Sequence, residues 1–296
     1  MIGLYLNSMK GDILLNINWY PGHMAKAKRL ISESLKLVDI ILEIRDARIP
    51  LSSANPDFDD LFINKSRIVF LNKSDLANSS ITRDWINWFA GQGIKAVSIN
   101  SLDPKDTNNA KNIILDTAKE FHDEILKRKG VKKTIRGMVI GIPNVGKSAF
   151  INGIAGAKKA KTGNKPGVTK VKQWIKVTPY LELLDTPGLL WPKLDQREVA
   201  LNLAYTRTIK EEILDTEEVA HYFLEKAKVE FPEAIVGRYG ELDMNLKGYE
   251  ILENICVQKG WMQAGGIPDI ERGSRHILDD FQQGRLGRVT LERPSK

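Results

Sequence analysis

Residues 141–148, GIPNVGKS, match the phosphate-loop pattern G-x-x-x-x-G-K-[S/T] and lie between an apolar strand-like run and a helical segment. In such a loop, backbone N–H groups at a helix N-terminus surround the phosphates of a nucleotide. We therefore expect Lys147 to reach the β and γ phosphates and the Ser148 hydroxyl to ligate Mg²⁺. The residues expected to bind nucleotide in this loop are Asn144, Val145, Gly146, Lys147, Ser148 and Ala149.

Apolar runs typical of strands alternate with helical periodicities on both sides of this loop. Several runs are almost continuously apolar, as is expected of strands covered on both faces. The pattern predicts an α/β fold, with a mainly parallel sheet and helices on both of its sides. The expected strands are residues 38–44, 67–72, 95–99, 137–142, 173–177 and 181–185, and the helical candidates between them include 82–90 and 106–127.

Beyond residues 191–192 the strand signals stop. Residues 217–231 carry apolar side chains three and four positions apart, and Asp215 with Glu218 resembles a capping box ahead of them. Two further short helices are expected, at 248–257 and 274–283. The sequence therefore predicts a small all-α domain after the α/β domain.

A second motif, NKSD, directly follows the expected strand at 67–72. An Asp carboxylate at its end could accept two hydrogen bonds from the N1 and N2 groups of guanine, whereas adenine offers no such pair of donors. A site built on paired polar groups rejects the analogue that leaves these groups unpaired. Together with the phosphate loop, the motif predicts a guanine-nucleotide site. Its residues are Asn72, Lys73, Ser74 and Asp75.

A third motif, DTPG, stands at the end of the expected strand at 181–185. Because D-x-x-G is common by chance, the interpretation depends on its position after the phosphate loop, with Thr169 between the two. We expect Thr169 to sense Mg²⁺ and the γ-phosphate. Asp185 would bind the water shell of the metal, and the Gly188 N–H would meet the γ-phosphate.

Composition and charge describe a soluble protein with an anionic partner. The 296 residues are long enough for two domains, and no apolar run approaches the roughly 20 residues that cross a bilayer, so we expect a cytoplasmic protein without a membrane partner. The single cysteine excludes an internal disulfide, and four scattered histidines offer no zinc cluster. Net charge is +7, and residues 125–181 hold fourteen Lys or Arg but no Asp or Glu. This basic segment favours a phosphate-rich partner over a merely solvated surface.

The motifs resemble the G1, G2, G3 and G4 motifs of the TRAFAC GTPases, in an unusual order. The guanine motif precedes the phosphate loop, as in the circularly permuted GTPases, so the order is G4-G5-G1-G2-G3. With WYPGHMAKAKR at 19–29 and GRLGRVTLE at 284–292, the sequence closely resembles the ribosome biogenesis GTPase A (YlqF) family. The resemblance extends from about residue 17 to residue 292.

The resemblance implies an N-terminal extension at 1–16, a permuted P-loop GTPase domain at 17–192 and a helical, RNA-binding domain at 193–296. It implies a GTP-hydrolysing assembly factor whose affinity for the large ribosomal subunit, or its precursor, changes with the bound nucleotide. Hydrolysis would be slow alone and faster on the particle. The loop over the base would contain Asn100 and Ser101, and rRNA phosphates would meet the basic segment and Arg272, Arg275, Arg285 and Arg288.

Two other interpretations stay open from the sequence. The protein could be an RNA-binding module that nucleotide regulates and in which turnover is incidental. It could also be a GTPase of another RNA-related pathway, such as tRNA modification. Stimulation of turnover by the particle separates the first alternative from an assembly GTPase, and GTP-dependent binding to large-subunit RNA separates the second.

Ras-like GTPases orient the attacking water with a glutamine just after D-x-x-G. Here Leu189 and Leu190 follow, and neither can hydrogen-bond water. His23, which follows a Pro-Gly turn, is therefore a candidate for this catalytic role beside Lys147 and Thr169, because imidazole can accept a hydrogen bond near neutral pH. The alternative is a structural histidine in a turn.

Asn144 in the phosphate loop is a candidate ligand of K⁺. In GTPases that use K⁺ as an activating cation, an asparagine at this position binds the ion, which would help to stabilise charge that develops on the transferred phosphate. The alternative is an asparagine that only tolerates its backbone conformation.

Overall fold

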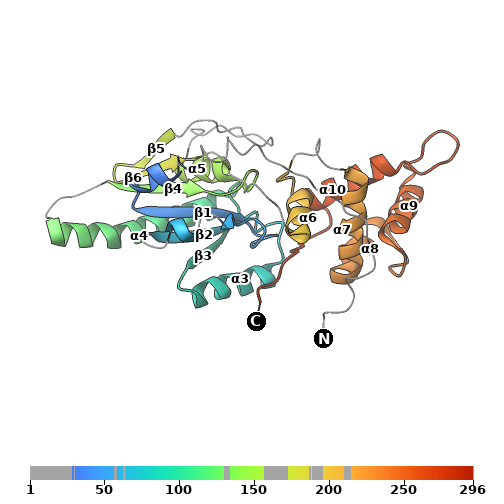
Figure 1. Ribbon diagram of the computed structural model, residues 1–296, viewed down its shortest axis with the longest axis horizontal. Coiled ribbons are helices and arrows are strands. Elements are labelled where there is room, and N and C mark those ends of the chain that lie inside the picture. Colours follow the sequence, from blue (N-terminus) through green and yellow to red (C-terminus); the bar gives the residue numbers. More distant parts are fainter. Residues whose placement is uncertain are drawn as a thin grey trace.

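The protein has an α/β part and a helical part, which lie side by side along its longest axis (Figure 1). The structure is a computed structural model. It describes residues 29, 31–56, 59–62, 65–129, 134–156, 173–186, 188, 196–209 and 215–295.

Six strands form one sheet in the order β3-β2-β1-β4-β6-β5. All neighbouring strands are parallel except β5, which pairs antiparallel with β6. The mainly parallel sheet predicted from the sequence is therefore confirmed. The strands are β1 (Ile40–Asp46), β2 (Ser66–Asn72), β3 (Lys95–Ile99), β4 (Ile135–Ile140), β5 (Gln173–Thr178) and β6 (Leu181–Asp185).

The first strand begins and ends two residues later than the sequence predicted. It continues through Arg45 and Asp46 because both charges are paired while buried. Arg45 donates to Glu43 at 2.8 Å, and Asp46 accepts from Arg48 at 2.8 Å. Buried charges are tolerated in a strand when they are paired in this way.

Helices cover both faces of the sheet, as predicted. In β2, Ile68 and Phe70 pack toward α4 and α5, while the alternating Val69 and Leu71 pack toward α3. This alternation is the consequence of the two-residue period of a strand. The helices of this part are α2 (Asp59–Phe62), α3 (Ser79–Gly91), α4 (Pro104–Lys129) and α5 (Lys147–Ala155).

The helical part packs α7 against α9 and α10. Its helices are α6 (Arg197–Tyr205), α7 (Thr216–Glu230), α8 (Pro232–Tyr239), α9 (Gly248–Lys259) and α10 (Ile270–Gln282). The three helices expected from periodicity are present, and Asp215 caps α7 by accepting from the backbone N–H groups of Glu217 and Glu218. Helix α10 begins four residues earlier than expected, because the Asp269 side chain caps it through the Arg272 N–H at 3.1 Å. Helices α6 and α8 were not predicted from the sequence.

The last residues of the chain return to the α/β part. We call residues 284–293 the C-terminal tail. The Leu291 N–H donates to the Arg48 carbonyl at 2.8 Å, and the Glu292 carboxylate accepts from the Leu51 N–H at 2.6 Å. The expected extension at 1–16 and both ends of the expected GTPase domain at 17–192 lie outside the described residues. No helix in the described part of the chain is both long and apolar enough to span a membrane.

Trp85 on α3 is fully buried and forms the centre of an aromatic cluster with Trp88 and Phe89. Its indole N–H donates to the Glu292 carbonyl at 3.1 Å. We expect Trp85→Ala to lower the free energy of unfolding by about 3–5 kcal/mol, because it leaves a cavity and an unpaired carbonyl. Trp88 is only half-buried, so Trp88→Ala is the matched control. It should lower the free energy of unfolding clearly less than Trp85→Ala does. Equal losses in urea denaturation of the two variants would contradict the packing described here.

Candidate nucleotide-binding site

The predicted motifs meet at the carboxyl ends of the parallel strands. The phosphate loop follows β4, and Asn100 and Ser101 follow β3. The NKSD motif begins on the last residue of β2, and the DTPG motif begins on the last residue of β6. Parallel strands present their carboxyl ends at one edge of a sheet, and ligands of open α/β sheets bind at that edge. Motifs that are far apart in the sequence therefore form one site.

The phosphate loop turns tightly from β4 into α5. Gly146 precedes the helix with φ +96°, in the left-handed region, and a Cβ atom there would collide with the Asn72 amide nitrogen. Only glycine fits this position without displacing Asn72. The loop thus places free backbone N–H groups at the start of α5, where an anion is favoured by the helix dipole.

Lys147 is the buried cation of the site. Its ammonium group donates to the Ile142 carbonyl of the same loop at 2.7 Å. Burial lowers the pKa of Lys147 to about 8, although the charge of Asp185 opposes this shift. A Cβ atom on Gly188 would lie 2.7 Å from the Lys147 ammonium, so the DTPG backbone is next to this cation. Lys147 and Gly188, the two residues expected to contact the γ-phosphate, therefore lie next to each other.

The described residues suit Mg²⁺ held in part by the nucleotide. Ser148 is the second residue of α5 and carries a hydroxyl, and the buried Asp185 ends β6, which pairs with β4. Hydroxyl and carboxylate oxygens, with phosphate oxygens and water, are the ligands that Mg²⁺ prefers. No group of three or more His, Cys, Asp or Glu side chains in the described part of the chain would hold a metal without a nucleotide. Thr169, the third predicted ligand, lies outside the described residues.

Asn72 connects the phosphate loop to the base loop. Its amide nitrogen donates to the Val145 carbonyl at 2.7 Å, and its amide oxygen accepts from the Ser101 N–H at 3.0 Å. The side chain is buried, so both hydrogen bonds are shielded from water. Asn72 therefore fixes the distance between the parts of the site that would bind phosphate and base.

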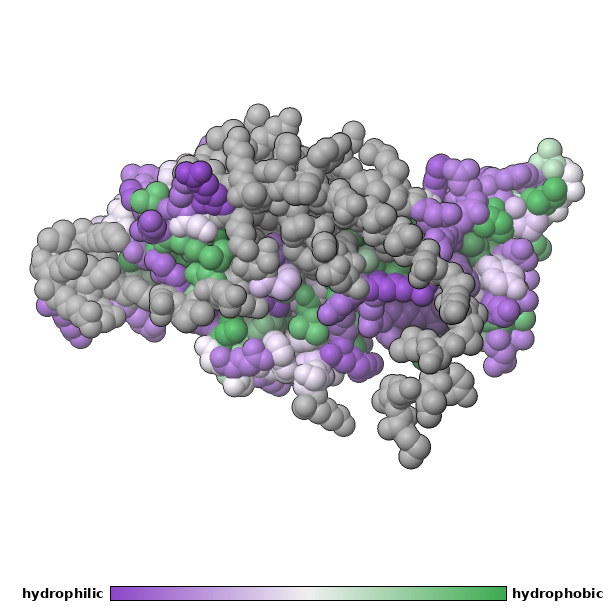
Figure 2. Space-filling view, in the orientation of Figure 1, coloured by the Kyte–Doolittle hydropathy of each residue, from purple (hydrophilic) through white to green (hydrophobic). Residues whose placement is uncertain are grey.

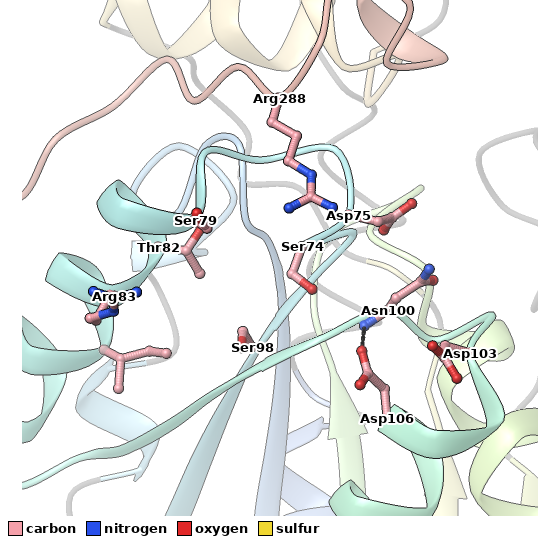
Figure 3. Close-up of a pocket in the computed structure, with 11 residues that line it drawn as sticks. Ser74, Asp75, Ser79, Thr82, Arg83, Ser98, Asn100, Asp103, Asp106 and Arg288 are labelled. Carbon is pink, nitrogen blue, oxygen red and sulfur yellow. Dashed lines mark hydrogen bonds between the residues drawn. The ribbon is translucent and has the colours of Figure 1, made fainter.

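Asp75 is one of the residues that line an open cavity of about 430 Å³ beside the base loop (Figure 3). Asn100 lines the same cavity, and its backbone N–H donates to Asp106 at 2.7 Å. The structure thus brings together the guanine motif and the loop that the resemblance placed over the base. The remaining lining residues are Ser74, Ser79, Thr82, Arg83, Ile86, Ser98, Asp103, Asp106 and Arg288.

An ion-pair network below the guanine motif was not predicted from the sequence. Lys73 has φ +58° and donates its ammonium group to Asp46 at 2.9 Å. Asp46 also accepts two hydrogen bonds from the buried Arg48, at 3.0 and 2.8 Å. Burial alone would raise the pKa of Asp46, but Arg48 and Lys73 hold it below its ordinary value. The signal in the sequence was a run of charges, Arg45 to Arg48, at the end of an apolar strand.

Asn144, the predicted K⁺ ligand, uses the nitrogen end of its side-chain amide in a contact within the fold. Its backbone is left-handed, with φ +61°, and its amide nitrogen donates to the Arg207 carbonyl just after α6. The amide oxygen is the atom that would bind K⁺, so the two functions use different ends of the side chain. His23, like Thr169, lies outside the described residues, and so do Leu189 and Leu190.

The chain is similar to known proteins in sequence and in fold. Residues 136–235 match the family model described as 50S ribosome-binding GTPase. The chain is 41% identical to the ribosome biogenesis GTPase A of Bacillus pumilus over 95% of this chain and 99% of that one. It is 42% identical to the ribosome biogenesis GTPase A of Priestia megaterium, over 95% and 98%. The chain belongs to the ribosome biogenesis GTPase A family.

The solved structure of YlqF from T. maritima, bound to GNP, is similar over 92% of this chain and 99% of that one, with a TM-score of 0.64 and 28% identity. Membership of this family confirms the resemblance seen in the sequence. It also confirms the fold class, an α/β P-loop GTPase domain with a permuted motif order and C-terminal helices.

We expect the affinity for guanine nucleotides to fall as the buried Lys147 loses its proton. With a pKa of about 8, most Lys147 is charged at pH 7 and roughly a quarter at pH 8.5. If the phosphates bind only the charged form, the dissociation constant should rise about fourfold between these pH values. Fluorescent GDP titrations would measure it.

Lys147→Arg is the control for this pH dependence, because arginine keeps its charge throughout the range. Its dissociation constant should be nearly constant from pH 7 to 8.5, whatever its absolute value. The same pH dependence in both proteins would show that Lys147 is not the titrating group.

Proposed function

We propose that this protein is a GTP-hydrolysing assembly factor for the large ribosomal subunit, whose affinity for the maturing particle changes with nucleotide state. The observation that carries the proposal is the convergence of the phosphate loop, NKSD and DTPG at one sheet edge in a chain of the ribosome biogenesis GTPase A family. The names of the relatives supply the ribosomal role. The site supplies the chemistry of a guanine-nucleotide switch.

In this proposal the protein contributes positioning and charge to phosphoryl transfer. Lys147 moves from the Ile142 carbonyl to the β and γ phosphates, and the Gly188 N–H meets the γ-phosphate. Ser148, Thr169 and Asp185 would hold Mg²⁺, Asp185 through water, and the ion would neutralise charge on the phosphates. Water attacks the γ-phosphate, and GDP and inorganic phosphate leave.

The RNA contacts would come from the helical part at 193–296. Arg272 and Arg275 are exposed on α10, and hydrophilic residues cover the surface of this part around α10 (Figure 2). Guanidinium groups on such a surface suit rRNA phosphates, and their contribution would weaken with salt. Arg285 is less available for RNA, because its guanidinium group already pairs with Asp279 and Asp280. A cytoplasmic location follows from a ribosomal partner in a bacterial-type factor.

The permuted order gives the switch a short mechanical path. The DTPG segment leads along the chain directly into α6 of the helical part rather than back into the sheet. Loss of the γ-phosphate contacts could thus reorient the helical part through one connection. Equal relative orientation and mobility of the two parts in the GTP and GDP states would contradict this route.

The particle should stimulate hydrolysis, and His23 should be needed for it. We expect His23→Ala to lower the rate of GTP hydrolysis on large-subunit particles about a hundredfold, the usual contribution of a positioned acid-base group, while GTP affinity is unchanged. His276→Ala, on the exposed side of α10, should keep the unstimulated rate of the wild type. Parallel loss of GTP affinity and rate would make His23 a structural residue.

Absence of stimulation by particles would favour the RNA-binding module with incidental turnover. Stimulation without GTP-dependent, salt-sensitive binding to large-subunit RNA would favour a GTPase of another RNA-related pathway. The same preparation answers both questions, because binding and hydrolysis are measured on one particle sample.

We expect K⁺ to accelerate hydrolysis over Na⁺ by about tenfold or more, through the amide oxygen of Asn144. Asn144→Ala should abolish the difference between the two salts. Asn144→Asp keeps an oxygen ligand but loses the donor to the Arg207 carbonyl, so it should keep the preference for K⁺. Loss of the preference in Asn144→Asp would instead assign Asn144 to the contact with Arg207.

A further inference from the structure

The C-terminal tail runs from the end of α10 onto the loop that carries the guanine motif. Gly284 begins the tail with φ +73°, and a Cβ atom there would lie 2.7 Å from the Leu76 side chain. Glycine at this position therefore permits both the left-handed turn and the close approach to the residue after Asp75.

Two hydrogen bonds hold the tail against this loop. The Val289 N–H donates to the Leu76 carbonyl at 3.1 Å, and the Thr290 hydroxyl accepts from the Asn78 N–H at 2.9 Å. Leu76 and Asn78 flank the turn that follows Asp75. The tail thus restrains the backbone on which the guanine-binding carboxylate is placed.

Glu292 anchors the other end of the tail. Its carboxylate accepts from the backbone N–H groups of Leu51 and Ser52, at 2.6 and 3.0 Å, and from the Asn202 amide at 3.1 Å. Val289, Thr290 and Leu291 are buried. A segment that is buried and bonded at both ends is part of the folded site.

Arg288 is an exposed residue of the tail, and its side chain projects into the cavity that Asp75 lines (Figure 3). The cavity also contains the carboxylates of Asp103 and Asp106. Asp106 accepts from the Asn100 N–H and Asp103 from the Lys105 N–H, so both serve the local backbone. Arg288 brings a positive charge to this acidic cavity, which Asp75, the residue expected to accept both guanine donors, also lines.

A second contact connects the end of α10 to the lysine of the guanine motif. The Arg48 guanidinium lies 5.1 Å from the centre of the Phe281 ring and donates to the Gln282 carbonyl at 3.4 Å. Arg48 pairs with Asp46, which in turn accepts from Lys73. The helical part is therefore connected to Lys73 through Arg48 and Asp46, and it contacts Leu76, the residue after Asp75, directly.

We propose that the C-terminal tail forms one wall of the guanine site and determines its selectivity, with Arg288 and the Gly284 turn as positioning elements for Asp75. The proposal rests on guanine-nucleotide binding, which belongs to the proposed function. Binding of the base and docking of the tail are then coupled in both directions, because each stabilises the same loop. This coupling connects the tail to the base of the nucleotide. It is separate from the proposed coupling between the γ-phosphate and the helical part through the DTPG segment.

The test compares GDP with IDP, which lacks the N2 amino group of guanine but carries the same phosphates. In the wild type, IDP should bind about tenfold or more weakly, since it loses one hydrogen bond to a carboxylate. Gly284→Ala and Arg288→Ala should each reduce this preference by about threefold to tenfold. Asp75→Ala lacks the acceptor for the N2 amino group, so it gives the ratio of IDP to GDP dissociation constants expected of a site without selectivity for guanine.

Two matched controls lie outside the cavity. Gly265 has φ +84° with open space around it, so Gly265→Ala adds the same backbone strain away from the site. Arg293→Ala removes an exposed charge of the tail beyond Glu292. Both controls should keep the preference for GDP measured with the wild type.

Arg288 is exposed, so Arg288→Ala is expected to fold and keeps the test decisive if Gly284→Ala does not. A GDP preference equal to that of the wild type in Arg288→Ala and in folded Gly284→Ala would overturn the proposal, and so would an equal reduction in the two controls. If the wild type bound no guanine nucleotide, the proposed function itself would fail. Loss of particle stimulation with an intact GDP preference would contradict only the ribosomal role.

Discussion

The hydrogen bonds of one side chain, Asn72, hold the nucleotide site together. Its amide donates to the phosphate loop and accepts from the loop after β3, at 2.7 and 3.0 Å. An amide is suited to this task because it is a donor at one end and an acceptor at the other, without a charge that burial would penalise. The phosphate loop keeps its glycine at position 146 because Asn72 occupies the space where a side chain would lie.

Much of this arrangement could be predicted from the sequence. Strands β3 and β6 were predicted with their observed bounds, and the buried β6 is mostly apolar, as expected of a strand covered on both faces. The phosphate loop and NKSD carry fixed residue types because phosphate and guanine demand particular donors and acceptors. A parallel sheet places the residues that follow its strands at one edge. Motif chemistry and strand order together were sufficient to bring Asn72, Asp75 and Lys147 into one site.

The remaining features depend on contacts that no local pattern records. Helix α6 is short, and its Asn202 is buried against the tail rather than exposed on a polar face. Arg48 was one charge in a charged run, and only the fold shows that it is buried between Asp46 and Phe281. Arg288 is a residue of the type that binds RNA phosphates, and in the sequence it was expected to do so. In the structure it lines the cavity beside Asp75. In each case the partner is distant along the chain, and periodicity describes only neighbours.

The order of the segments along the chain has a consequence for synthesis. Proteins are made from the N-terminus, and domains fold as they emerge. The strand before the guanine motif is made first, the phosphate loop follows, and the tail residues beside Asp75 come after both. A nascent chain can thus form its sheet while its base pocket is still open on one side. Any contribution of the tail to nucleotide retention would then begin only after residues 284–293 have been made.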